Sequence, residues 1–149
     1  MNFRKLGCLF VLSALSSFCQ TPSGGKVIHD KTGACQLTVP ADWTISAQIP
    51  WTAQAPSDQG DVQLVSQPGK TVKPMSDMAQ KAMMVAKMIQ NTPQSVAYAS
   101  QPTKGANPIT PYHAVAPGKD GTCVALLSAR AGLTDEAVKK IVATLSAAH

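Results

Sequence analysis

Apolar and polar residues alternate along several short stretches of the chain, and this pattern predicts β-strands. The clearest stretch is 35–39, where Cys35, Leu37 and Val39 alternate with two polar residues. Weaker versions of the pattern predict further strands at 27–30, 61–66, 94–100 and 112–116. The stretch 122–130 is apolar at odd and even positions alike, which is typical of a central strand covered on both faces.

Two stretches repeat their apolar residues every three to four positions, which predicts amphipathic helices. The first runs from about Ser76 to Gln90, with Ser76 as its cap. Its apolar stripe consists of Met78, Ala82, Val85 and Ile89. The second begins at the cap Thr134 and has two acidic residues in its first turn, which suit the positive end of the helix dipole. Its stripe consists of Val138, Ile141, Val142 and Leu145.

The order of these elements predicts an α+β fold in a single domain. Three strands precede the first helix, and three more separate it from the second. Residues 44–60 carry few regular signals and are interpreted as mostly loop. Hairpin-length connections around the later strands favour an antiparallel sheet, and each amphipathic helix needs a sheet face to cover.

Residues 1–19 have the three parts of a secretory signal peptide. Arg4 and Lys5 precede an apolar run over 6–15, and small residues follow it. Cleavage after Cys19 leaves residues 20–26 as a flexible stub and 27–149 as the domain. The alternative is a lipoprotein signal in which Cys19 is acylated and anchors the chain to a membrane. Phe18 favours simple cleavage, because a lipoprotein signal has a small residue directly before the cysteine. We therefore expect an exported protein, periplasmic or secreted, with no transmembrane span in the mature chain.

Two cysteines, Cys35 and Cys123, remain after the leader is set aside. In an oxidising compartment an even pair indicates a disulfide. The alternative is two separate buried thiols. A disulfide between them requires the two predicted strands to be neighbours or to face each other across a short gap, since the Cα atoms must lie within about 7 Å.

Composition limits the classes of partner. Hydrophobic residues make up 44% of the chain and charged residues 14%, so wholesale disorder is excluded. Without Arg4 and Lys5, 11 basic residues face 8 acidic ones, and the exported part carries a charge near +3. The lysines are spread along the chain and few aromatic residues accompany them, so no nucleic-acid partner is expected.

Residues with the spacing of a known active site are absent from the sequence. The three histidines, His29, His113 and His149, do not form a spaced metal pair, and no HExxH motif occurs. No nucleophile elbow and no paired carboxylates appear either. We therefore expect no enzyme, no cofactor and no metal site built from these groups.

Methionines are the unusual feature. Met75, Met78, Met83, Met84 and Met88 crowd the first predicted helix and its approach. On that helix Met84 and Met88 lie four residues apart on a polar flank, which places two thioethers together. Soft sulfur ligands suit Cu(I). The other interpretation is that this pair packs against a loop or a partner, because methionine fills irregular surfaces well.

The segment Leu37-Thr38-Val39-Pro40-Ala41-Asp42-Trp43 resembles the strand-Pro-x-Gly/Asp-Trp segment of the PsbP-like group of small domains. The ending, a hairpin, an apolar strand and a capped helix, is similar to that group too. The resemblance implies an α/β/α sandwich, and a binding or assembly role rather than catalysis. It implies no catalytic residues.

These observations lead to one main hypothesis and one alternative. The main hypothesis is an exported non-enzymatic domain that binds or stabilises a partner at the cell envelope. The alternative is a copper-handling module that uses Met84 and Met88.

Overall fold

Residues 24–46 and 52–149 are described by a computed structural model of the chain. The expected signal peptide, its cleavage site beside Cys19 and the first part of the stub lie outside these described residues. Among the described residues, no helix is long and apolar enough to cross a membrane.

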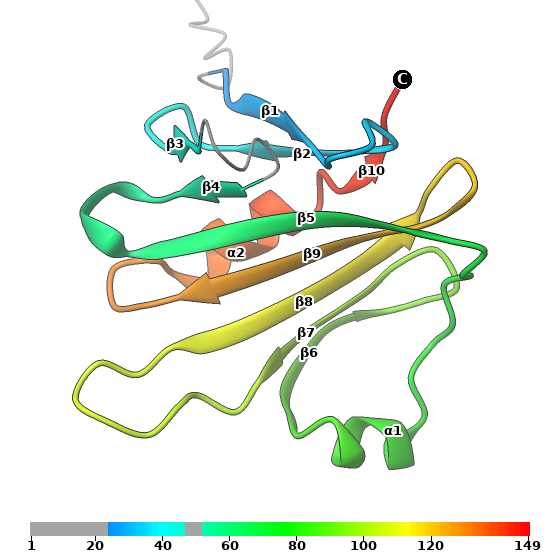
Figure 1. Ribbon diagram of the computed structural model, residues 1–149. Coiled ribbons are helices and arrows are strands. Elements are labelled where there is room, and N and C mark those ends of the chain that lie inside the picture. The colour runs from blue at the N-terminus through cyan, green and yellow to red at the C-terminus, as the bar shows by residue number, and fades with distance from the viewer. Residues whose placement is uncertain (1–23, 47–51) are drawn as a thin grey trace, which may run out of the picture.

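Seven strands form one antiparallel sheet in the spatial order β3-β4-β5-β9-β8-β7-β6 (Figure 1). Their bounds are Thr44–Ile45 for β3, Thr52–Gln54 for β4, Gly60–Pro68 for β5, Val85–Asn91 for β6, Val96–Ser100 for β7, Thr110–Pro117 for β8 and Gly121–Ala129 for β9. The short 3-10 helix η1 (Pro56–Asp58) connects β4 to β5. Every pairing in this sheet is antiparallel, in agreement with the short connections in the sequence.

The centre of this sheet is β9, which pairs with β5 on one side and with β8 on the other. Its pairing with β5 extends from Gly60 opposite Ala129 to Pro68 opposite Gly121. The prediction of a central strand from the apolar run at 122–130 is confirmed. Leu126 is the most exposed residue of this strand, at 37%.

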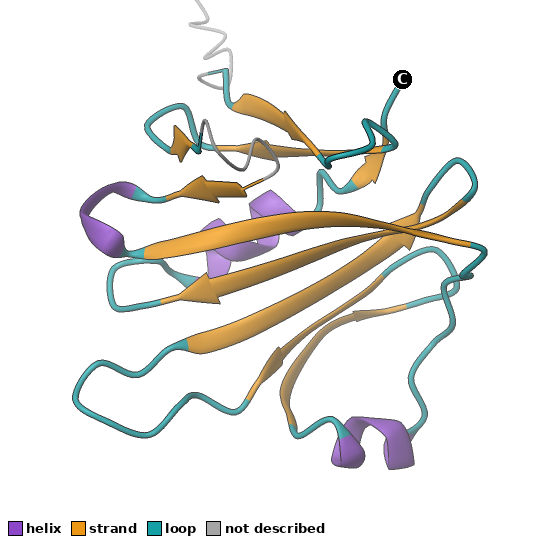
Figure 2. Ribbon diagram, viewed as in Figure 1, coloured by secondary structure: helices purple, strands orange, loops and turns teal. Residues whose placement is uncertain are grey.

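A smaller sheet and a helix lie over one face of the large sheet. The small sheet has the order β1-β2-β10, with β1 at Lys26–His29, β2 at Cys35–Val39 and β10 at Ser146–Ala147. Helix α2 spans Asp135–Val142 and lies beside β2, behind β5 and β9 in the views of Figures 1 and 2. The face they cover is called the inner face below.

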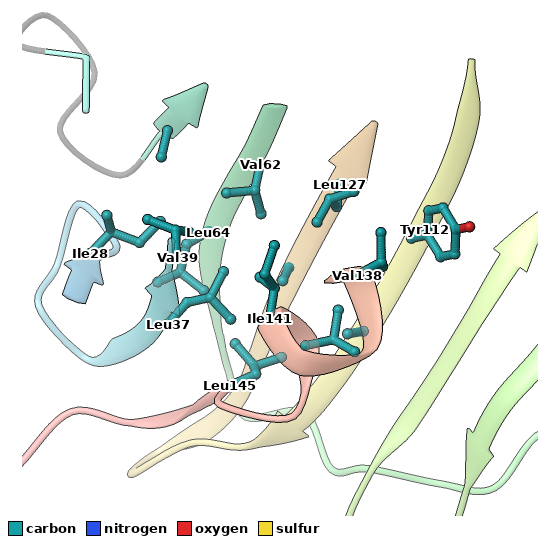
Figure 3. Packing of buried hydrophobic residues seen from close by; sticks show 14 of the residues in the cluster. Ile28, Leu37, Val39, Val62, Leu64, Tyr112, Leu127, Val138, Ile141 and Leu145 are labelled. Carbon is teal, nitrogen blue, oxygen red and sulfur yellow. The ribbon is translucent and has the colours of Figure 1, made fainter. Parts of the chain in front are cut away.

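The core lies between α2, β2 and the inner face. Leu37 and Val39 from β2 approach Ile141 and Leu145, and Val62 and Leu64 of β5 complete this layer (Figure 3). All four residues of the stripe predicted for the last helix are buried: Val138, Ile141, Val142 and Leu145. The alternating pattern of β2 is confirmed as well, because Cys35, Leu37 and Val39 are all buried and the two polar residues between them are half-exposed.

A disulfide joins Cys35 of β2 to Cys123 of β9, with their Cα atoms 5.6 Å apart. The two strands belong to different sheets. The bond therefore fastens the small sheet to the central strand of the large one. Of the two arrangements that the sequence allowed, the strands face each other across a short gap and are not neighbours in one sheet.

Trp43 belongs to this core. The chain turns directly after β2, where the Trp43 amide donates to the Pro40 carbonyl at 3.1 Å. The indole is 2% exposed, and Lys26 Nζ donates to the Trp43 carbonyl at 2.8 Å. The large ring after the strand-ending proline is thus buried with the core residues.

The first predicted helix is much shorter than expected. Helix α1 covers only Asp77–Ala82, and the second half of the predicted helix is strand β6. The region 44–60, interpreted as loop, contains β3, β4 and η1. Strands β6 and β10 are also missing from the predicted order of elements, so that order was wrong at 85–91 and at 146–147.

The fold is a single domain made mostly of antiparallel sheet with two helices. The expectation that each helix covers a sheet face is wrong for α1, because none of its residues is buried. Figure 2 shows α1 below the sheet, at the end remote from β1 and β2.

Candidate binding surface

The residues 70–88, which we call the methionine segment, run from the end of β5 into β6 and contain five of the six methionines. Its helix α1 begins as the sequence predicts: Ser76 Oγ accepts a hydrogen bond from the Ala79 amide at 3.2 Å, and Asp77 occupies the first turn. The helix ends after Ala82. The cap position is Met83, and Met84 has a φ of 52°, in the left-handed region where a helix cannot continue.

Strand β6 replaces the rest of the predicted helix because its residues satisfy two patterns at once. Val85 and Ile89 fall on a helical stripe, yet both are β-branched and favour a strand. Pairing with β7 settles the competition, and the register shifts twice along β6, between Val85 and Lys87 and between Met88 and Gln90. These irregularities hide the alternation by which a strand is usually found.

Met84 and Met88, the predicted methionine pair, are therefore not one helical turn apart. Met84 lies at the end of α1, whereas Met88 lies in β6 opposite Tyr98 of β7. Four residues of extended strand span about 13 Å. The predicted proximity of the two thioethers on a helix is wrong, and the copper hypothesis loses the geometry on which it rested.

Three methionines of the segment are exposed, and we call them the methionine tip: Met78, Met83 and Met84, whose side chains are 81%, 51% and 63% exposed. The prediction that Met78 lies on a buried stripe is wrong, because α1 packs no face against the sheet. Met75 and Met88 are half-buried. Large apolar side chains at such exposure need a reason, since isolated ones are common but clustered ones mark contact sites.

Both ends of this excursion are fastened to the large sheet beside its edge strand. The Met75 amide donates to Asn91 Oδ1 at 2.7 Å, and Asn91 Nδ2 donates back to the Met75 carbonyl at 3.0 Å. At the other end, the Gln101 amide donates to the Met84 carbonyl at 3.2 Å. The tip is thus held between two fixed points, and the segment passes beside β6, the edge of the sheet.

The outer face of the large sheet, opposite α2, is apolar in its middle. One row across it consists of Val65, Val124, Val115 and Val96, and the next consists of Gln63, Leu126, His113, Tyr98 and Met88. Residues 71–75 of the methionine segment border a groove over Val96, Tyr98 and Val115. This face is therefore covered in part by the chain itself.

His113 and Tyr98 stack within this outer face, with ring centroids 5.0 Å apart and planes 12° apart. Burial lowers the pKa of His113 and raises the pKa of Tyr98. The pair is uncharged at neutral pH and behaves as an aromatic packing unit. The other two histidines lie in other parts of the chain. His29 is exposed in β1, and His149 is the last residue. Within 24–46 and 52–149, no three His, Cys, Asp or Glu side chains gather closely enough to hold a metal ion.

A polar contact joins α2 to the large sheet near the methionine segment. The Tyr112 hydroxyl and Lys87 Nζ both donate to the carboxylate of Asp135, in the first turn of α2. Burial, together with this hydrogen bond, raises the pKa of Tyr112 to about 12. The hydrogen bonds from Lys87 and Tyr112 lower the pKa of Asp135. Tyr112 thus stays protonated and Asp135 ionised near neutral pH, so the contact holds α2 in place and exchanges no proton there.

A buried carboxylate and a cavity accompany the disulfide. Asp30 is 6% exposed, and its carboxylate accepts hydrogen bonds from the Cys35 amide at 2.8 Å and the Thr32 hydroxyl at 2.6 Å. Burial alone would raise the pKa of Asp30, but these hydrogen bonds prevail and lower it to about 2. The neighbouring cavity of about 300 Å³ is lined by turn residues such as Thr32, Gly118 and Asp120. This arrangement stabilises the turn before β2.

Sequence reasoning found the methionines but missed their surroundings. The stacked pair Tyr98 and His113 follows from the pairing of β7 with β8, which the sequence order of the strands indicates only coarsely. Alternation in 94–100 and 112–116 was the available signal, because it places both rings on one face once the register is known.

Comparisons with known proteins give a structural likeness. No protein-family model matches the sequence, and no curated protein matches it. A chain from Bacteroides thetaiotaomicron VPI-5482, in a crystal structure at 1.50 Å resolution, is similar with a TM-score of 0.58 and 15% identity. The alignment covers 84% of this chain and 48% of that chain, so this chain spans about half of its length. At this identity the likeness shows the fold alone.

Proposed function

We propose that this protein is an exported, non-enzymatic domain that binds a partner at the cell envelope through its methionine tip. The proposal is carried by one observation: Met78, Met83 and Met84 are exposed on one short excursion of the chain. Its helix α1 has no buried residue. Thioethers are flexible and polarizable, and surfaces rich in methionine adapt to the shape of what they bind.

Export is supported by the disulfide between Cys35 and Cys123 and by the signal-like residues 1–19. Disulfides form and persist in oxidising compartments. We propose simple cleavage near Gln20, with a lipid anchor on Cys19 as the alternative. Intact-mass measurement of the protein from its native host separates the two, because an acyl chain adds a fixed mass to the first residue.

A kinship with the PsbP-like group is part of this proposal. It is supported by the strand β2, the turn at Pro40 and the buried Trp43, together with the final order of β8, β9 and α2. The α/β/α arrangement of that group requires helices on both sheet faces. In this chain α2 lies over one sheet face, and α1 covers none.

A copper-handling module is the second candidate, and one observation favours it. Three thioethers, those of Met78, Met83 and Met84, are exposed within seven residues of each other along the chain. Thioethers prefer Cu(I) to harder metals. Titration of the purified protein with Cu(I) under reducing conditions tests this candidate, and a variant with all three methionines replaced is the control.

Binding to isolated native envelopes tests the main proposal. The variant Met78→Gln with Met84→Asn removes two exposed apolar chains, and Asn is among the residues that tolerate the left-handed conformation at 84. Val27→Gln is the matched control, because Val27 is 51% exposed on β1, away from the tip. We expect the tip variant to lose envelope binding and the control to retain it. Equal binding by all three proteins would overturn the proposal.

A further inference from the structure

The shape of the methionine tip limits what it can bind. The tip stands on an excursion next to the edge strand β6, at the end of the molecule remote from β1 and β2 (Figure 1). A hollow lies beside Met84 and Val85, and its other lining residues are polar or charged: Asp77, Gln80, Lys81 and Gln101. A partner helix needs an apolar groove for its apolar face. Met78, Met83 and Met84 instead stand exposed on a projection, which suits a broad and deformable apolar partner.

Charge is concentrated on the same excursion. Residues 70–88 contain four lysines and a single acidic residue, a charge of +3. Residues 20–149 as a whole also carry +3, with 11 basic and 8 acidic residues. The remainder of that part of the chain is therefore balanced, and the whole excess lies in the methionine segment.

Most of these lysines are available to a partner. Lys87 is occupied, because it pairs with Asp135. Lys70, Lys73 and Lys81 are exposed, and none of them forms an ion pair within the part of the chain that the structure describes. Exposed apolar side chains flanked by unpaired lysines form the pattern by which proteins bind anionic lipid surfaces, where the two contributions act together.

We propose that the methionine tip docks on the surface of an anionic lipid bilayer. Met78, Met83 and Met84 enter the boundary between headgroups and acyl chains, and Lys70, Lys73 and Lys81 face the headgroup phosphates. This inference rests on the proposed function and names its partner. Neither the methionines nor the lysines suffice alone. Three side chains bury little apolar area in the bilayer, and the attraction of a few lysines to anionic lipid is effective only at low salt.

Sedimentation with lipid vesicles tests the proposal. The protein used is residues 20–149, produced by export with a leader that is cleaved off. It contains every described residue and lacks both the apolar leader and Cys19. The protein is mixed with vesicles of phosphatidylcholine alone, or of equal parts phosphatidylcholine and phosphatidylglycerol. We expect binding to the anionic vesicles, little binding to the neutral ones, and loss of binding at high salt.

Three variants assign the binding to its residues. Met78→Gln with Met84→Asn should weaken binding about tenfold, because the apolar contribution is removed while the charge is kept. Lys73→Gln with Lys81→Gln should weaken it by a similar factor and reduce its dependence on salt. Val27→Gln should bind like the parent. Circular dichroism of each variant shows that the fold is kept, as expected for exposed positions.

The outcomes separate this proposal from the proposed function. Absence of binding to anionic vesicles, or equal binding by the Met78/Met84 variant, overturns the lipid proposal. If that variant nevertheless loses binding to native envelopes, the tip has a protein partner, such as an acidic segment, and the proposed function stands. If envelope binding is unchanged as well, both proposals fail.

Discussion

Single side chains in this protein contribute to stability according to what surrounds them, and Leu37 and Met78 mark the two extremes. Leu37 of β2 is fully buried in the core, whereas Met78 is exposed on α1. We expect Leu37→Ala to lower the free energy of unfolding by about 2–5 kcal/mol. Met78→Ala should change it by less than about 0.5 kcal/mol. Urea denaturation measures both, and a large loss for Met78→Ala would show that α1 packs against the sheet.

Asp30 gives the fold a dependence on pH. Its pKa in the folded protein is about 2, below the ordinary 3.8, so the ionised form stabilises the fold. This contribution is complete above about pH 4 and is lost as the pH falls towards 2. We expect Asp30→Asn to cost about 2 kcal/mol at neutral pH. Near pH 2 the variant and the parent should be almost equally stable, and denaturation curves across this range decide the matter. A difference that stayed constant would assign the loss to packing.

At the scale of elements, two helices with the same kind of cap differ in what the cap stabilises. Thr134 accepts a hydrogen bond from the Ala137 amide, and Ser76 accepts one from the Ala79 amide. Helix α2 packs into the core, so Thr134→Ala should lower global stability by about 1 kcal/mol. Helix α1 buries nothing, so Ser76→Ala should leave the unfolding midpoint unchanged and speed amide exchange within α1 alone. Equal destabilisation by the two changes would contradict this division.

Elements whose signals are local could be predicted from the sequence. Strand β2 alternates cleanly, β9 is apolar on both faces, and α2 has both a cap and a stripe. All three are found where expected. Strands β3 and β10 have two residues each and exist only because a partner strand pairs with them. Nothing in their own residues distinguishes them from loop.

The methionine segment shows why the candidate site could be predicted only in part. Composition alone indicates a surface rich in thioethers. The orientation of each methionine depends on where α1 ends, and that point is set by the pairing of Val85–Asn91 with β7. Because Val85 and Ile89 fit a helix as well as a strand, the local pattern extended the helix too far. The extended pattern therefore predicts Met88 on a helix, whereas it lies in β6. It also predicts Met78 on a buried stripe, whereas no residue of α1 is buried.

At the scale of the whole molecule, the disulfide fastens the small sheet to the large one. Cys35 and Cys123 are 88 residues apart in the sequence. Closing a loop of this length in the unfolded chain stabilises the fold by about 4 kcal/mol on the chain-entropy model. We expect Cys35→Ala with Cys123→Ala to lose about that much, as measured by denaturant melts. The parent protein treated with a reductant should lose a similar amount, and a negligible loss in both would show that the two sheets need no covalent tie.

The whole molecule presents two opposite ends, with the small sheet at one and the methionine tip at the other (Figure 1). The central claim is that the tip is the end that contacts the envelope. A photo-reactive amino acid placed at Met78, or at Val27 as the matched exposed position, tests it in living cells. We predict that irradiation attaches envelope material to the chain from position 78, with lipid as the adduct, and leaves position 27 unmodified. Adducts from position 27 alone, or none from position 78, would contradict the account.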